Sequence, residues 1–355
     1  MAASPDDFGL SPEATLAEVG SSVLPPGFMQ FFDGWLASLR DETARFEEAD
    51  GDALLRAGAP GITHTLASHG GVHVGCHVAR PAGEPTGVVV TTHGYGVAPG
   101  DPLSDDGRWT SRGMITIRLR ARGFPGSQMD VGDLTGRSGG YIVQGIESLE
   151  TWVLTGAVAD LINTVRAARA MVGPGVPICM HGESFGGGIA ILAASLLQDF
   201  EPVTRLAIAL PTFGHWAWRH EHPIDAGSGA DIRRRLESGS VDVKEVMHSL
   251  RLLDTVVHAA RVHCPTVAKL ALRDEIVPAP TAAAVYNALG SDPGKKWRFI
   301  VRFGHHIDAD MPMADLRRHA MFEQLSAAFL DPSEDIDALM DRWDPVLIEG
   351  TEAPR

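Results

Sequence analysis

The amino-acid sequence predicts a single α/β domain with a mostly parallel central sheet, helices on both faces and an N-terminal helical extension. Short apolar runs alternate with helical patterns over about 270 residues, which is typical of this fold class. The runs are apolar throughout rather than at every second position, as expected for strands that helices cover on both faces. A length of 355 residues with 44% hydrophobic residues allows a substantial core.

Three segments follow from this pattern. Residues 1–60 are predicted to form a polar segment and a helical extension packed on the body, and residues 1–24 to pack loosely or not at all. Apolar residues recur at helical spacing in the extension: Phe28, Phe32, Trp35, Leu36 and Leu39. Residues 61–331 are predicted to form the α/β domain, and residues 332–355 an acidic, proline-containing tail.

The elements of the body can be predicted in chain order. The first two apolar runs are separated by Ser68-His69-Gly70-Gly71, which predicts a β-hairpin. The predicted strands cover residues 62–67, 72–78, 88–92, 114–119, 176–180, 206–210, 266–272 and 297–302. The predicted helices cover residues 146–171, the stretch after Ser184, and residues 280–289 and 313–330. Residues 212–260, rich in His and Trp, are expected to be irregular at first and then helical.

The motif G-x-S-x-G at Gly182–Gly186 lies between a predicted strand and a predicted helix. This context is typical of a nucleophile elbow, in which the serine occupies a strained turn with its hydroxyl exposed. Glycines are expected on both sides because side chains there would crowd the strand and the helix. Ser184 is therefore the candidate nucleophile, and the N–H of Phe185 would face a developing oxyanion. A glycine-rich turn with an idle serine is the alternative interpretation.

A serine nucleophile needs a base and a carboxylate that orients it. Asp274 directly follows the strand at 266–272, and His305 follows the next strand. The chain order serine, carboxylate, histidine is typical of the α/β-hydrolase fold, so Ser184, His305 and Asp274 form the predicted triad. Glu275 and His306 adjoin these two residues and remain alternatives.

The loop after the strand at 88–92, His93-Gly94-Tyr95-Gly96, predicts the second oxyanion donor, the backbone N–H of Tyr95. Phe213 and Trp216 are candidate substrate-binding residues beyond the next strand, although packing of Trp216 against the body is equally compatible with the sequence. The histidines near 220 match no structural zinc spacing. We predict no metal and no organic cofactor.

Several segments resemble the acetyl xylan esterase and cephalosporin-C deacetylase group, carbohydrate esterase family seven. The resemblance covers residues 25–330, and its segments are THGYG, ARGFPGS, GYIVQGIESLETW, HGESFGGG, DEIVPAPTAAAVYNAL and FGHH. It implies an eight-stranded α/β-hydrolase fold, hydrolysis of short acyl esters and often hexamers whose active sites face an inner cavity. By position it assigns the triad and oxyanion residues named above and favours His305 over His306.

The sequence also departs from that family. Phe185 replaces the usual glutamine after the nucleophile, and Phe124 and Pro125 replace the Gln and Gly of the Arg-Gly-Gln-Gly loop. His306 stands where the family has glutamate, and residues 152–154 replace a tyrosine-rich stretch. Backbone donors survive such changes, whereas the pocket around the ester is expected to be more apolar than in sugar deacetylases.

We therefore predict a serine esterase that hydrolyses short-chain acyl esters, chiefly acetyl esters, of a small molecule. Another α/β-hydrolase activity on the same triad (peptidase, lactonase or acyltransferase), or a non-catalytic fold, is the alternative. The net charge of −15 disfavours nucleic acid and anionic membranes as partners. Three dispersed cysteines, no export signal and no apolar run of about 18 residues predict a cytoplasmic protein. A homo-oligomer is expected from the resemblance.

Overall fold

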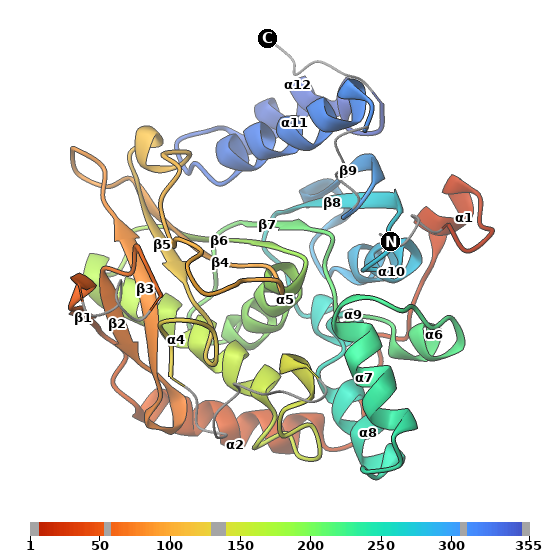
Figure 1. The fold of residues 1–355 in the computed structure, drawn as a ribbon. Coiled ribbons are helices and arrows are strands. Elements are labelled where there is room, and N and C mark those ends of the chain that lie inside the picture. Colours follow the sequence, from red (N-terminus) through yellow and green to blue (C-terminus); the bar gives the residue numbers. More distant parts are fainter. Residues whose placement is uncertain (1–6, 53–57, 129–139, 306–310, 350–355) are drawn as a thin grey trace.

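The computed structural model describes residues 7–52, 58–128, 140–305 and 311–349 (Figure 1). They form a nine-stranded mixed sheet in the order β1-β2-β3-β5-β4-β6-β7-β8-β9. The strands are β1 (Phe46–Glu48), β2 (His64–Ala67), β3 (His73–Ala79), β4 (Gly87–Thr92), β5 (Met114–Leu119), β6 (Ile178–Glu183), β7 (Leu206–Ala209), β8 (Thr266–Arg273) and β9 (Lys296–Phe303). All pairings from β5 to β9 are parallel, and those of β1, β2 and β3 are antiparallel. The resemblance implied eight strands, and the sheet has one more because β1 pairs with β2 at its edge.

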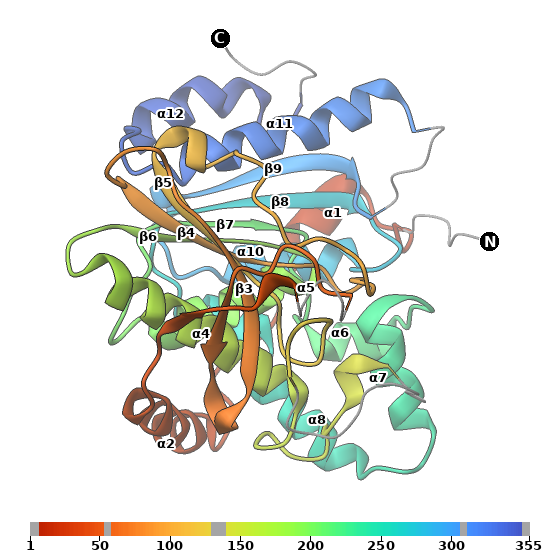
Figure 2. The same cartoon turned by 60° about the vertical axis from the view of Figure 1, so that its left-hand side comes forward.

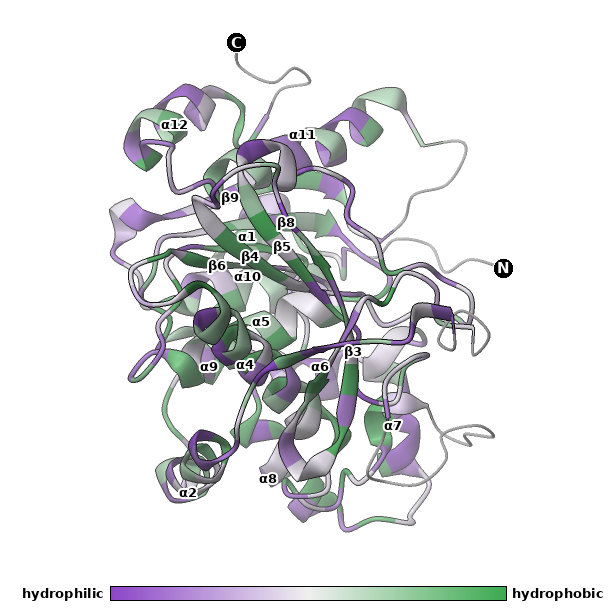
Figure 3. Ribbon diagram, turned by 90° about the vertical axis from the view of Figure 1, so that its left-hand side faces the viewer, coloured by the Kyte–Doolittle hydropathy of each residue, from purple (hydrophilic) through white to green (hydrophobic). Residues whose placement is uncertain are grey.

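Helices cover both faces of the sheet, as predicted (Figure 2). One face carries α2 (Phe28–Asp41), α4 (Val153–Val172), α5 (Phe185–Leu197), α9 (Thr255–Ala259) and α10 (Ala279–Ala288), and the other carries α11 (Met313–Phe329) and α12 (Ile336–Trp343). Successive strand residues alternate between the two cores: Val88 and Val90 belong to the larger cluster, and Val89 to the smaller one beneath α11. In Figure 3 the central strands are largely green, that is hydrophobic, and the outer helices carry purple, hydrophilic residues.

The long helix α4 begins later than the predicted residue 146. The segment before it forms the short helix η3 (Tyr141–Val143) and a series of turns. Gly145 has a φ of +66°, and a Cβ there would overlap the carbonyl of Thr151. The indole N–H of Trp152 donates to the Ile142 carbonyl at 2.6 Å. These contacts fix a compact turn where apolar spacing alone predicted helix.

The N-terminal segment is attached to the body, so the expected loose packing is wrong for its described part. Helix α1 (Pro12–Ala17) packs against α10. The side-chain amide of Asn287 donates to the carbonyls of Leu16 and Glu18, at 3.0 and 2.7 Å. Arg251 donates to the Ser21 carbonyl at 2.7 Å. Such backbone contacts cannot be recognised from the polar composition of the segment.

The C-terminal segment, predicted as a tail, contains α12 and the short helix η5 (Asp344–Val346). Apolar residues of this segment enter the core beneath α11: Leu339, Met340, Trp343 and Leu347. The Ile300 N–H donates to the Leu347 carbonyl at 2.8 Å, which attaches the segment to β9. Capping by Asp335 at the start of α12 agrees with the usual role of aspartate at a helix N-terminus.

Residues between β7 and β8 form a helical layer of α6 (Trp216–Glu221), α7 (Gly227–Glu237), α8 (Val243–Leu252) and α9. Figure 1 shows α6, α7 and α8 together at one side of the molecule. Asp242 and Asp254 cap α8 and α9 through their side chains. Among the helices that the structure describes, none combines the length and apolarity needed to cross a bilayer.

Candidate active site

The nucleophile elbow has the strained geometry that its sequence predicts. β6 ends at Glu183, α5 begins at Phe185, and Ser184 between them has φ 54° and ψ −117°. Positive φ is rare for a side chain with a Cβ, so surrounding contacts must hold it. The Ser184 N–H donates to the Ala209 carbonyl of β7 at 2.8 Å, and its own carbonyl accepts from Gly188 at 3.0 Å.

Glycines flank the serine because backbone from other elements lies against them. A Cβ on Gly182 would overlap the Gly186 carbonyl, and one on Gly186 would lie 3.1 Å from the His93 carbonyl. A Cβ on Gly187 would lie 2.9 Å from the Ala209 carbonyl, and one on Gly188 would lie 2.7 Å from the Phe213 ring. Helix α5 therefore packs closely on the ends of two strands and their loops.

Asp274 and His305 lie together at the ends of neighbouring parallel strands, β8 and β9. The His305 Nδ1 is 2.8 Å from each carboxylate oxygen of Asp274, which is fully buried. The same carboxylate accepts from the N–H groups of Ile276 and Val277, at 2.8 and 2.9 Å. Gly304 makes room for it, because a Cβ there would overlap Asp274 Oδ2. The rival His306 lies outside the described residues.

The protonation of His305 follows from these contacts. Burial favours the neutral imidazole, but the hydrogen bond and charge of Asp274, with the charges of Glu183 and Glu275, outweigh it and raise the pKa of His305. Nδ1 donates to the carboxylate, so Nε2 of the neutral ring is an acceptor. Nε2 is buried and has no hydrogen-bond partner among the described residues. It is thus available as a proton acceptor.

The described residues contain no hydrogen bond between Ser184 Oγ and His305 Nε2. The charge of His305 nevertheless acts on Glu183, the residue before the serine, which places the imidazole near the elbow. Hydrogen bonds of this kind are often long or misaligned without substrate. Of the two hydrogen bonds that the predicted triad requires, the described residues contain the one between Asp274 and His305.

Glu183 itself is a residue that sequence reasoning missed. The Lys269 Nζ of β8 is buried and lies 2.7 Å from Glu183 Oε1. Burial alone would raise the pKa of Glu183, but this ion pair and the nearby histidines lower it to about 2. A second carboxylate thus stays ionised beside the imidazole. Its position directly before the serine was visible in the sequence, whereas its partner on another strand was not.

Both predicted oxyanion residues lie beside the serine helix. The Phe185 N–H, at the start of α5, donates to no acceptor within the described part of the chain. The Tyr95 ring lies 5.8 Å from the Phe185 ring. The Tyr95 hydroxyl donates to Asp231 Oδ2 at 2.9 Å and accepts from the Ile142 N–H at 3.0 Å. Helix α7 and the turn before α4 therefore hold the loop after β4, an anchor that the sequence did not reveal.

Aromatic side chains surround the elbow. The Phe185 ring contacts the rings of Phe124, Tyr141 and Phe213 at centroid distances of 5.7 to 6.1 Å. All four are buried. Burial lowers the pKa of the adjacent His93 to about 4, so this ring is neutral as well. Phe124 and Phe185, the two aromatic departures from the family pattern, belong to one apolar cluster.

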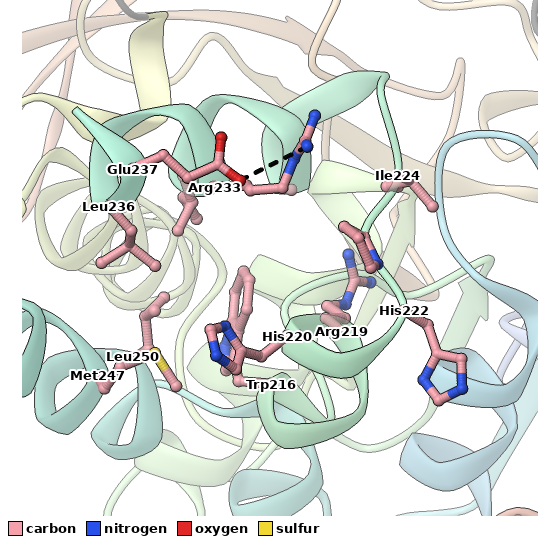
Figure 4. Close-up of a pocket in the computed structure, with 13 residues that line it drawn as sticks. Trp216, Arg219, His220, His222, Ile224, Arg233, Leu236, Glu237, Met247 and Leu250 are labelled. Carbon is pink, nitrogen blue, oxygen red and sulfur yellow. Dashed lines mark ion pairs between the residues drawn. The ribbon is translucent and has the colours of Figure 1, made fainter.

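The two candidate substrate-binding residues lie apart. Phe213 has φ 67° and is fully buried against Phe185. Trp216 belongs to α6 and lines a cavity between α6, α7 and α8 (Figure 4), and Ser184 is not among the residues that line this cavity. The nearby histidines engage other groups: His215 Nε2 lies 3.2 Å from Glu18, and the His222 ring stacks on Trp218. The described residues include no group of three or more side chains suited to a metal ion.

Comparisons with known proteins agree with this fold. Residues 13–318 match the model of the acetyl xylan esterase family, AXE1. The acetyl xylan esterase from Paenibacillus sp. R4 superposes with a TM-score of 0.69 at 21% identity, over 89% of this chain and 99% of that one. Acetyl xylan esterase 1 from Thermoanaerobacterium sp. JW/SL YS485 gives a TM-score of 0.69 at 19% identity, over 90% and 99%.

A more distant structure is the acylaminoacyl peptidase from Pyrococcus horikoshii, with a TM-score of 0.52 at 15% identity over 76% of this chain and 42% of that one. At these identities the structural neighbours establish the fold alone, the α/β-hydrolase fold. The match of the family model over most of the chain confirms the resemblance seen in the sequence. The chain belongs to the acetyl xylan esterase family and is a carboxylic ester hydrolase.

Proposed function

We propose that the protein is a serine esterase that removes short acyl groups, chiefly acetyl, from small-molecule esters through an acyl-enzyme. The observation that carries this proposal is the Asp274–His305 pair, whose buried Nε2 is left as an acceptor. A serine in a strained turn lies at the end of β6, which β7 separates from β8 in the same sheet. Together they supply the base and the nucleophile that acyl transfer requires.

In the proposed cycle Ser184 Oγ attacks the ester carbonyl while His305 Nε2 takes its proton. Asp274 holds the imidazole in the correct tautomer and stabilises the imidazolium. The N–H groups of Phe185 and Tyr95 donate hydrogen bonds to the carbonyl oxygen as negative charge develops on it. The imidazolium then protonates the departing alcohol. Water, deprotonated by His305, releases the acid from Ser184.

The ion pair of Glu183 with Lys269 supports this cycle. It keeps a carboxylate charged beside His305, and that charge adds to the effect of Asp274 in raising the pKa of His305. The imidazolium formed during attack is therefore favoured by Glu183 as well as by Asp274 and Glu275. Because the base must be neutral before attack, activity is expected to rise as the pH passes upward through the raised pKa of His305.

The Tyr95 hydroxyl is proposed to position the oxyanion loop. Tyr95→Phe removes the bonds to Asp231 and Ile142. We expect kcat to fall by about thirtyfold, since each such bond contributes about 1 kcal/mol and the two together about 2 kcal/mol. KM should change little, because the loss concerns the transition state. Steady-state kinetics on p-nitrophenyl acetate measure both constants. The matched control is Tyr286→Phe in α10, whose hydroxyl donates to the Lys296 carbonyl at the start of β9. An unchanged kcat would show that this anchor does not set the loop.

The aromatic cluster around Phe185 supports an apolar ester pocket. We expect p-nitrophenyl acetate and butyrate to be turned over with higher kcat/KM than acetylated xylo-oligosaccharides. A p-nitrophenyl octanoate should be poorer than the butyrate, because close packing around Phe124 and Phe213 leaves little room for a long chain. Initial rates across this panel test the proposal. A strong preference for the acetylated sugar would contradict the apolar pocket, and no turnover of any ester would contradict the esterase itself.

A further inference from the structure

A cavity of about 130 Å³ lies within the helical layer, between α6, α7 and α8 (Figure 4). Its apolar wall includes Trp216, Ile232, Leu236, Met247 and Leu250. None of Ser184, Asp274 and His305 is among the residues that line it. The face of α7 that carries Asp231 contacts Tyr95, whereas its residues 232 and 236 face the cavity. The cavity is therefore separated from the oxyanion loop by helix α7.

A buried guanidinium lies at the wall of this cavity. The Arg219 Nε donates to the Gly214 carbonyl at 3.0 Å, and Nη2 donates to Thr212 Oγ1 and Thr281 Oγ1, at 3.3 and 3.1 Å. Only 8% of Arg219 is exposed. Nη1 donates to no acceptor within the described residues. It lies 3.3 Å from where a Cβ on Gly229 would be, and Gly229 also lines the cavity.

The charge of Arg219 has no carboxylate in contact. All three of its hydrogen bonds go to neutral oxygens, and no ion pair joins it to a described residue. The other arginine at the cavity, Arg233, is already paired with Asp225 and Glu237. Burial lowers the pKa of Arg219 to about 10, so it remains protonated at neutral pH. The Trp216 ring, whose centroid is 5.4 Å from the guanidinium carbon, and the charges of Asp254 and Asp274 beyond contact distance stabilise this cation. A carboxylate in direct contact would offset more of the cost of burying it.

We propose that this cavity binds a small carboxylic acid with an apolar body. The carboxylate accepts from Arg219 Nη1, and the body packs on Trp216 and the aliphatic side chains. The volume is close to that of a cavity of about 150 Å³ known to hold benzene, so the acid is about the size of benzoate. No triad residue lines this cavity, although the charge of Asp274 acts on Arg219, and the proposal does not depend on the proposed function.

The cavity offers a substitution that blocks the ligand without removing Arg219. Gly229 lies in α7 without a positive φ, so alanine suits the helix there, and its methyl would cover Nη1. Leu236→Phe is a second, independent substitution that fills the apolar part of the cavity with a larger side chain. The matched control is Gly34→Ala in α2, where a Cβ meets nothing within 4 Å. None of the three positions belongs to the proposed catalytic machinery.

The test is calorimetric titration of the full-length protein with benzoate and with benzyl alcohol. We expect saturable benzoate binding, with benzyl alcohol weaker by about tenfold or more because it lacks the charge that Arg219 recognises. Gly229→Ala and Leu236→Phe should each weaken benzoate binding by about tenfold or more, while Gly34→Ala leaves it unchanged. All three variants should retain p-nitrophenyl acetate hydrolysis, which separates this site from the ester site.

Three results would overturn the proposal. Equal affinity for benzoate and benzyl alcohol would mean that Arg219 does not recognise a carboxylate. Undiminished benzoate binding in both Gly229→Ala and Leu236→Phe would place the ligand elsewhere. No saturable benzoate binding to the wild-type protein would leave the cavity without this role.

Discussion

Ser184→Ala should lower kcat for p-nitrophenyl acetate by about a million-fold, the loss measured when the nucleophile of a serine hydrolase is removed. Alanine retains the Cβ and can keep the backbone bonds to Ala209 and Gly188, so the melting temperature should change little. The effect is large because no other described residue can replace a hydroxyl at the end of β6. Kinetics on purified wild type and variant measure the loss.

A fluorophosphonate label makes this prediction independent of substrate choice. The wild-type protein should be labelled at Ser184, as shown by peptide mapping, and the alanine variant should not. Ser238→Ala, at an exposed position after α7, is the control and should retain both labelling and turnover. If Ser184→Ala kept most of the wild-type kcat, the nucleophile would have to be sought elsewhere.

Asp274→Asn is expected to lower kcat by about ten-thousand-fold, as the equivalent change does in serine proteases. The asparagine can still accept from the N–H groups of Ile276 and Val277, but its amide would donate towards His305 Nδ1. The imidazole would then carry its proton on Nε2 and could not accept one from Ser184. The fold should be retained, because the carboxamide of asparagine has nearly the same shape as the carboxylate that it replaces.

The pH dependence gives a second readout of Asp274. The carboxylate raises the pKa of His305, and the base works only when neutral, so its loss should move the acidic limb of kcat/KM to lower pH. Glu275→Gln is the matched control, since Glu275 adjoins Asp274 and contributes a smaller part of the same shift. A larger loss of kcat in Glu275→Gln than in Asp274→Asn would exchange the roles of the two residues.

Much of the body could be predicted from the sequence because its signals are local. Continuous apolar runs mark the buried parallel strands, and the strand predicted at 114–119 matches β5 residue for residue. The elbow could be recognised because the steric requirement for glycine at positions 182 and 186 is visible within a five-residue motif. Asp274 and His305 could be paired because both follow strands, and neighbouring parallel strands end at the same edge of a sheet.

The remainder depends on contacts between distant segments. Trp216 belongs to the helical layer, whose packing on the body fixes it beside α7 and α8, and no periodicity near residue 216 indicates that. The anchors Tyr95–Asp231 and Glu183–Lys269 join residues far apart in the chain. Strand β1 has only three residues, one of them apolar, so it carries no strand pattern of its own.

The three consecutive glycines after Ser184 restrict how this enzyme can change its specificity. A Cβ on Gly186 would lie 3.1 Å from the His93 carbonyl and one on Gly188 would lie 2.8 Å from the Thr212 carbonyl, so α5 packs directly on the loops after β4 and β7. Insertions or bulkier residues at those points of contact would displace α5, which begins directly after Ser184. The loop after β4 can therefore lengthen and diversify only beyond Tyr95, and the loop after β7 only beyond Gly214.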